Sequence, residues 1–148
     1  MSDLNKRKLP LAARLMLGGI FLVMGLNGLF EFLSMPPMPE AARAFMIALV
    51  ATGYMMPLIK ITEIVGALML LSGRYVPLGL TLLAPGIVNI LLFHAMLAPA
   101  GIGLAVFIVA LEIYLAYSYR DVFRPMLSTN PRTTAAKPVH ERFAYDRP

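Results

Sequence analysis

Four long apolar runs, separated by short polar, proline-rich or glycine-rich segments, fill most of the chain up to residue 119. The first run, at residues 15–30, carries no formal charge. Residues 75–111 carry none either, and these 37 residues are too many for one bilayer crossing of about 20 residues, so the break at Pro99-Ala100-Gly101 divides them. With their flanks, the runs predict four transmembrane helices, at about 11–33, 54–73, 78–97 and 102–119.

The connection between the first two spans predicts one further helix. Pro36, Pro37 and Pro39 end the first span, because proline lacks the N–H that a helix interior requires. Pro39 and Glu40 then suit the first turn of a new helix, where that N–H is not needed and the acid meets the positive end of the helix dipole. We therefore predict an all-α fold: an integral membrane four-helix bundle with an extra short helix, at about 40–52, in the first outer loop.

The end of the chain has a different composition. Beyond about Leu127, basic residues alternate with Pro, Thr, Asn and Ala, and few apolar side chains are present to bury. We expect a transmembrane domain at 1–127, followed by a disordered cytoplasmic tail at 128–148.

The overall composition supports the membrane interpretation. Hydrophobic residues make up 59% of the chain and charged residues only 14%, against roughly a quarter in soluble domains. The mean hydropathy is +0.74. Cysteine is absent, which excludes disulfides, thiolate metal sites and iron–sulfur clusters built by this chain. A soluble enzyme and a disordered protein are both disfavoured.

The basic residues predict the orientation in the membrane. Four spans place both termini on one side, and eleven of the thirteen basic residues fall there. Arg43 lies on the other side and Lys60 within a span. By the positive-inside rule, both termini face the cytoplasm. The net charge of +5 is then explained by the membrane, with anionic-lipid contact, rather than by nucleic acid.

Polar residues inside the spans are the candidate site. With the orientation above, they lie near the bilayer centre or in its outer half, which predicts one polar pocket that opens outward. Ionisable residues at this depth are costly and usually functional. The candidates for ligand binding are Lys60, Glu63, Asn89, His94 and Asn27, with Glu112 in second place.

Each candidate also has a structural interpretation. Lys60 and Glu63 are three residues apart, share a helix face, and could form an ion pair that only locks the bundle. Asn27 could hydrogen-bond between helices, and His94 could be a proton relay, a quinone partner, a metal ligand or simply a satisfied polar group. Glu112 needs a partner on another helix or a proton. We predict no metal site as the main interpretation.

Methionine and glycine add two further expectations. Thioethers on the outer side could hold Cu(I), although methionine is also a common packing residue. The methionines concerned are Met35, Met38, Met46, Met55, Met56 and Met96. Glycines within the spans favour close helix packing, and these are Gly18, Gly19, Gly25, Gly28, Gly66 and Gly86.

Four sequence segments stand out: TGY…PLIKI-x-EIVG, GR-x-VPLGL, AP-x-IVNI-x-LFH and YRD-x-FRP. Together, within a similarity from about Ala13 to Leu127, they resemble the DoxX family (DoxX/DoxD-like) of small four-helix bacterial membrane proteins. The resemblance implies a four-helix bundle in a bacterial plasma (inner) membrane. It also implies a link to membrane oxidoreductase assemblies, including subunits similar to those of thiosulfate:quinone oxidoreductase. On matching positions it implicates Lys60, Glu63, Asn89 and His94, with Asn27 in the first helix.

The leading functional hypothesis is an accessory or quinone-interacting subunit of a membrane oxidoreductase. No cofactor motif is present, so quinone is the cofactor to consider and electrons would come from partner subunits. The alternatives are a small proton or solute carrier, and a scaffold or assembly protein without its own chemistry. The expected partners are the lipid bilayer, oxidoreductase subunits and further copies of the chain, with no nucleic acid.

Overall fold

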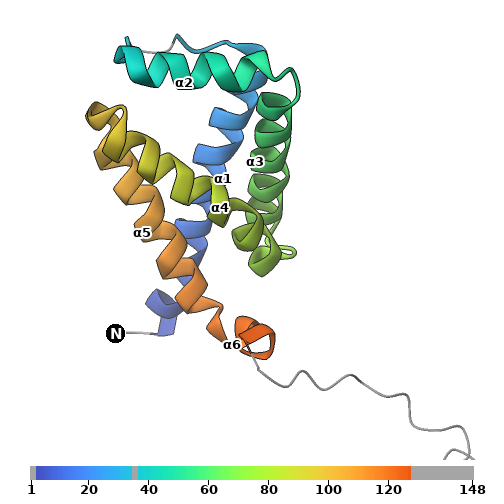
Figure 1. The fold of residues 1–148 in the computed structure, drawn as a ribbon. Helices are drawn as coiled ribbons and strands as arrows, with labels where there is room; N and C mark the ends of the chain where they lie inside the picture. Colours follow the sequence, from blue (N-terminus) through green and yellow to red (C-terminus); the bar gives the residue numbers. More distant parts are fainter. Residues whose placement is uncertain (1–2, 35–36, 128–148) are drawn as a thin grey trace, which may run out of the picture.

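The computed structural model describes residues 3–34 and 37–127, and within these residues it contains helices and no strands (Figure 1). The predicted tail at 128–148 lies outside the described residues. The elements, in chain order, are α1 (Asp3–Phe30), α2 (Glu40–Ala51), α3 (Met55–Ser72), α4 (Val76–Met96), η1 (Pro99–Gly101), α5 (Ile102–Ser118), α6 (Arg120–Phe123) and η2 (Arg124–Leu127).

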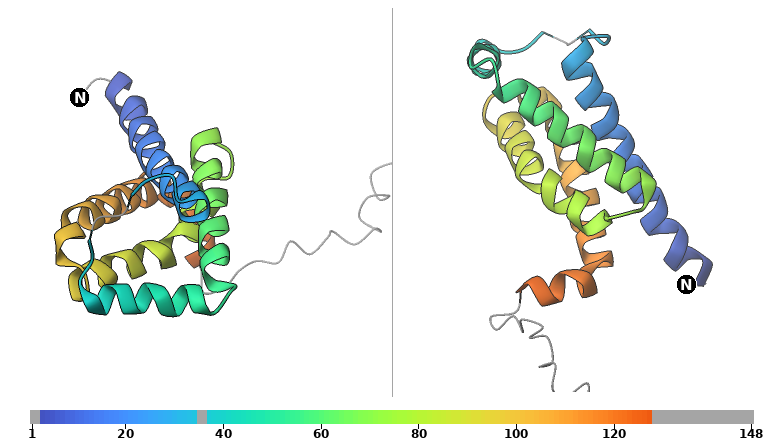
Figure 2. Two further views of the ribbon diagram at one scale, coloured as in Figure 1. Left: turned by 90° about the horizontal axis from the view of Figure 1, so that it is seen from above. Right: turned by 90° about the vertical axis from the view of Figure 1, so that its right-hand side faces the viewer.

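The four long helices form a ring. α1 packs against α3 and α5, and α4 lies between α3 and α5. α2 runs across one end of this bundle, whereas the start of α1 and the short α6 lie at the opposite end (Figures 1 and 2). The predicted fold class, a four-helix membrane bundle with one extra short helix, is confirmed.

Within the described residues, four segments are long and apolar enough to cross a membrane: Lys8–Phe30, Met55–Ser72, Val76–Met96 and Pro99–Ser118. Large apolar side chains such as Leu58, Ile61 and Val106 point outward and are about half exposed. In water such surfaces would be an aggregation hazard, whereas in a bilayer they meet lipid tails. The chain is therefore a multi-pass membrane protein.

The ends of the helices have local causes. α1 begins at Asp3, before the expected span, and ends at Phe30 rather than Leu33. The reason for its end is Glu31, which takes a left-handed conformation (φ 51°) that a helix cannot continue. Gly53 (φ 74°) and Gly73 (φ 72°) follow α2 and α3 in the same conformation, which glycine adopts without steric cost.

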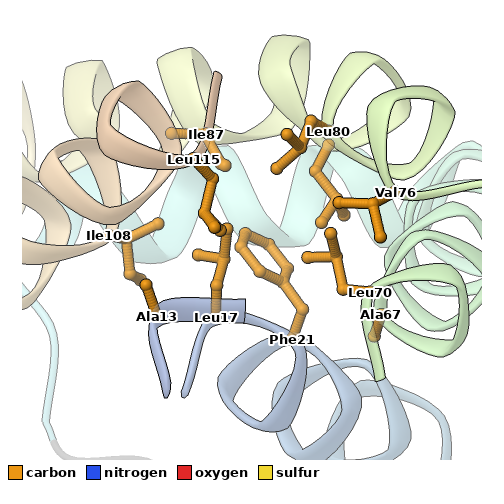
Figure 3. Close-up of a cluster of buried hydrophobic side chains, with 11 residues drawn as sticks. Ala13, Leu17, Phe21, Ala67, Leu70, Val76, Leu80, Ile87, Ile108 and Leu115 are labelled. Atoms are coloured by element: carbon orange, nitrogen blue, oxygen red, sulfur yellow. The ribbon is translucent and has the colours of Figure 1, made fainter. Parts of the chain in front are cut away.

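A cluster of buried apolar side chains holds the half of the bundle away from α2 (Figure 3). Leu17 and Phe21 of α1 meet Leu70 of α3, Leu80 of α4 and Leu115 of α5, and none of these side chains is more than 2% exposed. Because lipid tails are as apolar as leucine, the stabilisation comes from close packing rather than from escape from solvent.

Close packing depends on some of the glycines but not on all those expected. A Cβ added at Gly18, Gly25 or Gly66 would lie within 3.0 Å of Leu71, Ile64 or Leu83 respectively, so the helices approach closely there. At Gly19 and Gly86 an added Cβ would meet nothing within 4 Å. The expectation that these two glycines serve close packing is wrong, because their faces have no neighbouring helix at that distance.

Candidate functional site

A cavity of about 360 Å³ lies inside the end of the bundle that α2 covers. All four long helices contribute to its wall, and Phe45 and Met46 of α2 cover it on the side of the crossing helix. Phe21 of α1 and Ile108 of α5 belong both to the cavity wall and to the buried apolar cluster. These two side chains therefore form its floor, above the packed half of the bundle.

The structure brings four of the sequence-predicted residues together. Lys60 and Glu63 on α3, and Asn89 and His94 on α4, all line this cavity. The rest of the wall is mostly apolar. Polar side chains that converge in a mostly apolar cavity are the usual arrangement of a small-molecule site, since the few polar groups orient the ligand.

Lys60 and Glu63 form an ion pair in the cavity wall. Lys60 Nζ lies 2.8 Å from Glu63 Oε2, and the two side chains are 15% and 9% exposed. Gly28 of α1 makes room for this pair, because an added Cβ would collide with the methylene stem of Lys60. Gly25, one turn earlier, would place a Cβ 3.5 Å from the Cβ of Glu63. The small face of α1 thus fixes where the pair lies.

His94 is held by contacts on several sides. Its Nδ1 lies 3.0 Å from the carbonyl oxygen of Ala98, and because a carbonyl only accepts, Nδ1 carries the proton and donates. In the neutral ring, Nε2 then keeps a lone pair for another partner. Phe93 packs edge-on against the imidazole with ring centroids 5.3 Å apart, and Phe45 of α2 lies 5.8 Å from Phe93. A Cβ at Gly101 would collide with the imidazole.

Asn27 is buried but is not among the residues that line the cavity. Its Oδ1 accepts a hydrogen bond of 2.6 Å from the backbone N–H of Leu33, in the segment that follows α1. The backbone carbonyl oxygen of Asn27 also accepts a hydrogen bond of 2.8 Å from the backbone N–H of Glu31. Asn27 therefore shapes the exit from α1 at the cavity end of the bundle.

Glu112 also lies apart from the four cavity residues. It is on α5, four residues and therefore about one turn beyond Ile108, on the packed side of the cavity floor. Its Oε2 is buried and has no hydrogen-bond partner among the described residues. Lys60, a basic group within the spans, is paired with Glu63 instead.

Sequence reasoning missed the residues that position the polar groups. Phe45, Phe93 and Gly101 gave no signal of their own, because an aromatic or a glycine in an apolar run reads as ordinary packing. Three of the expected methionines, Met38, Met46 and Met56, do line the cavity. Within the described residues, no three His, Cys, Asp or Glu side chains gather as metal ligands would.

The architecture and the cavity define a class: a small four-span helical membrane protein with a mostly apolar cavity beneath a crossing helix. The family model for DoxX matches residues 9–96, which is more than half of the chain. The chain belongs to the DoxX family. The matched segment contains all four cavity residues described above, whereas Glu112 lies beyond it. Comparisons with curated proteins and with solved structures give no significant match.

Proposed function

We propose that this protein is a subunit of a membrane oxidoreductase system and binds the head group of a quinone or quinol in the cavity beneath α2. One observation carries the proposal: an apolar cavity of about 360 Å³ is lined by four polar side chains from two helices. This volume lies near the lower end of the range for small-molecule sites, about 300–1,000 Å³. A quinone ring has matching chemistry, because it is planar and apolar with two polar oxygens.

The polar groups have the capacity that such a ring requires. Lys60 has three N–H donors and uses one on Glu63, so two remain for a quinone carbonyl. Nε2 of neutral His94 can accept a hydrogen bond from a quinol hydroxyl, because Nδ1–H is held by Ala98. The amide of Asn89 can donate or accept. The bound quinone would supply the redox chemistry, with partner subunits as the source or destination of electrons.

The proposed orientation places the cavity in the outer half of the membrane. The basic residues favour cytoplasmic termini, and membership of the DoxX family favours a bacterial plasma membrane. The start of α1 and α6 share the end of the bundle opposite α2 (Figure 1). α2 and the cavity would then face the outside, in agreement with the depths expected for Lys60, Asn89 and His94.

A proton carrier is the second candidate, and Glu112 is the observation that favours it. A buried carboxyl oxygen without a hydrogen-bond partner among the described residues lies about one turn beyond the cavity floor. A carrier needs such a group between the cavity and the far side. Against this, Phe21 and Ile108 separate Glu112 from the cavity with packed side chains. Proton flux into liposomes that contain the purified protein would favour the carrier.

The test of quinone binding uses the contact between Gly101 and His94. The protein is placed in nanodiscs, and the dissociation constant of a decyl-substituted benzoquinone and of its quinol is measured by calorimetry. We expect His94→Ala and Gly101→Ala to weaken quinol binding by about tenfold, which corresponds to about 1.4 kcal/mol. Gly101 has φ −93°, so alanine is acceptable to the backbone there and acts by displacing the imidazole.

Gly103→Ala is the matched control, because a Cβ at Gly103 meets nothing within 4 Å. It should bind as the wild-type protein does. If the wild-type protein binds neither form of the quinone, the proposal fails and the scaffold hypothesis takes its place.

A further inference from the structure

The packing between α3 and α4 changes along their length. Near the turn that joins them, the two helices touch closely: a Cβ at Gly79 would lie 3.1 Å from the carbonyl oxygen of Gly66, and a Cβ at Gly66 would lie 2.7 Å from Leu83 Cγ. Gly86 follows Gly79 by seven residues and so lies on nearly the same side of α4. There, an added Cβ would meet nothing within 4 Å. The helices therefore separate beyond Leu83.

The figures show the same divergence. α4 leaves the turn beside α3 and inclines away from it toward the start of α5, both in the side view and in the view from above (Figures 1 and 2). α2 crosses the end of the bundle from near the end of α4 to the start of α3 (Figure 2). By contrast, α1 and α3 stay close over a longer stretch, since Gly18, Gly25 and Gly28 all meet α3 side chains.

The polar residue beside this separation is Asn89. It lies one turn beyond Gly86, it is exposed, and it lines the cavity. Its neighbours Val88 and Leu92 are 56% and 54% exposed and belong to the membrane-crossing segment of α4. Exposed side chains of this apolar segment meet lipid rather than water, and Asn89, which is exposed and also lines the cavity, lies at the edge of the cavity wall.

We propose that the cavity opens sideways into the bilayer between α3 and α4, beneath α2, and takes the polar head of a membrane-resident amphiphile whose hydrocarbon tail stays in the lipid. Asn89 is the polar group at this opening, and Lys60 and Glu63 lie on the helix across it. The inference rests on the cavity being the ligand site proposed above, and it assigns that site a tailed, lipid-borne ligand. The opening lies within the span of α4. When the head group of such a ligand enters the cavity there, its hydrocarbon tail therefore remains in contact with lipid.

The first test measures what reaches Asn89 and does not depend on the identity of the ligand. The chain has no cysteine, so single nitroxide labels can be attached at Asn89→Cys, Val88→Cys and Tyr54→Cys. Val88 is the lipid-facing reference, and Tyr54, 61% exposed at the start of α3, is the reference outside the apolar spans. In liposomes, the collision rate of each nitroxide label with lipid-soluble oxygen is compared with its collision rate with a water-soluble nickel complex. The ratio of the two rates is the oxygen-to-nickel ratio of that site.

We expect the oxygen-to-nickel ratio at residue 89 to match that at Val88 within about twofold, since both sites meet lipid. A decyl-substituted benzoquinone should lower oxygen access at residue 89 and not at Val88. Nickel access at residue 89 equal to that at Tyr54 would show a cavity open to water and would overturn the inference. An unchanged oxygen access at residue 89 would overturn it as well, provided that the labelled Asn89→Cys variant itself binds the quinone.

The second test narrows the opening. Gly86→Leu fills the open space on α4 and raises helix propensity, so the fold is retained. We expect it to weaken binding of the decyl-substituted quinone by about tenfold and that of the same ring without a tail by less than about threefold. Gly103→Leu, also in open space, is the matched control and should change neither.

Equal binding of the tailed quinone by wild type and Gly86→Leu refutes the opening between α3 and α4. A wild-type protein that binds neither quinone refutes the proposed function alone, because the collision measurement still decides whether residue 89 faces lipid or water. The two failures are therefore distinguishable.

Discussion

The ion pair in the cavity wall allows the sharpest prediction, because one pair of atoms is expected to serve both stability and binding. Lys60 Nζ and Glu63 Oε2 are 2.8 Å apart, and the side chains are only 15% and 9% exposed. Breaking a buried pair by removing one partner costs about 3–5 kcal/mol, whereas replacing both partners by apolar residues is neutral or stabilising. The three variants to compare are Lys60→Met, Glu63→Leu and the double replacement.

The two single variants should differ. Lys60 is five residues from the start of α3 at Met55, so its Cα lies only about 7–8 Å from that end of the helix. Without Glu63, its long side chain can extend toward the membrane surface. Glu63 is buried, and its shorter carboxylate has no such escape once Lys60 is gone. We therefore expect Lys60→Met to be the more destabilising of the two single changes. It should lower the free energy of unfolding by about 3 kcal/mol, which is near the cost of placing one unpaired charge at a helix centre.

The measurement is a double-mutant cycle from unfolding in mixed detergent and SDS micelles, followed by circular dichroism. Ile61→Met, on the lipid-facing side of the same helix turn, is the control for a change to methionine. The double variant should be more stable than either single variant by about 1–3 kcal/mol. If the effects of the single variants simply add in the double variant, the pair has no net coupling and the reasoning is wrong.

The same double variant separates a binding site from a structural lock. It should fold, because apolar side chains replace two charges in an apolar wall, and it should lose quinone binding, because both N–H donors offered by Lys60 are gone. Unimpaired binding in a stable double variant would show that the pair only holds α3 in place. The proposed ligand contacts would then rest on Asn89 and His94 alone.

Three further predictions concern other parts of the molecule. Gly28→Ala should destabilise the protein despite alanine's higher helix propensity, because its Cβ collides with Lys60, whereas Gly19→Ala should be neutral or stabilising; thermal unfolding in detergent compares the two. Glu112→Leu should stabilise the protein by about 1–3 kcal/mol by removing a buried oxygen that lacks a partner among the described residues, and a less stable variant would show a partner there. Reporter enzymes fused after Leu127 should be active only if they work in the cytoplasm, and activity of an exported reporter would reverse the proposed orientation.

The sequence was sufficient for the architecture because membrane spans are set by local rules. Each span must satisfy its own backbone hydrogen bonds and remain apolar over about 20 residues, so charge-free runs and their breaks predict it directly. The short helix followed from Pro39 and Glu40 in the same way, and α2 begins at Glu40. What the sequence did not predict was the end of α1, since the left-handed conformation of Glu31 has no counterpart in composition.

The candidate site was predictable only in part, because it depends on how helices rotate and tilt against one another. The pairing of Lys60 with Glu63 follows from a spacing of three residues on one helix. That Asn89 and His94 of α4 line the same cavity depends on packing across the bundle, as does the position of Asn27 outside it. Gly66 and Gly86 look alike in sequence, yet one lies against Leu83 and the other faces open space.

The crossing helix α2 contacts the bundle at Phe93, the residue beside His94. Phe93 lies between Phe45 of α2 and His94, with centroid distances of 5.8 Å and 5.3 Å. A change in where α2 rests would therefore move Phe93, and with it the surface against which the imidazole packs. His94 is also fixed on its other side by Ala98 and Gly101, so its ring has little freedom to compensate. α2 therefore reaches His94 through Phe93, and the side chains that α2 adds to the cavity wall, those of Phe45, Met46 and Leu49, are apolar.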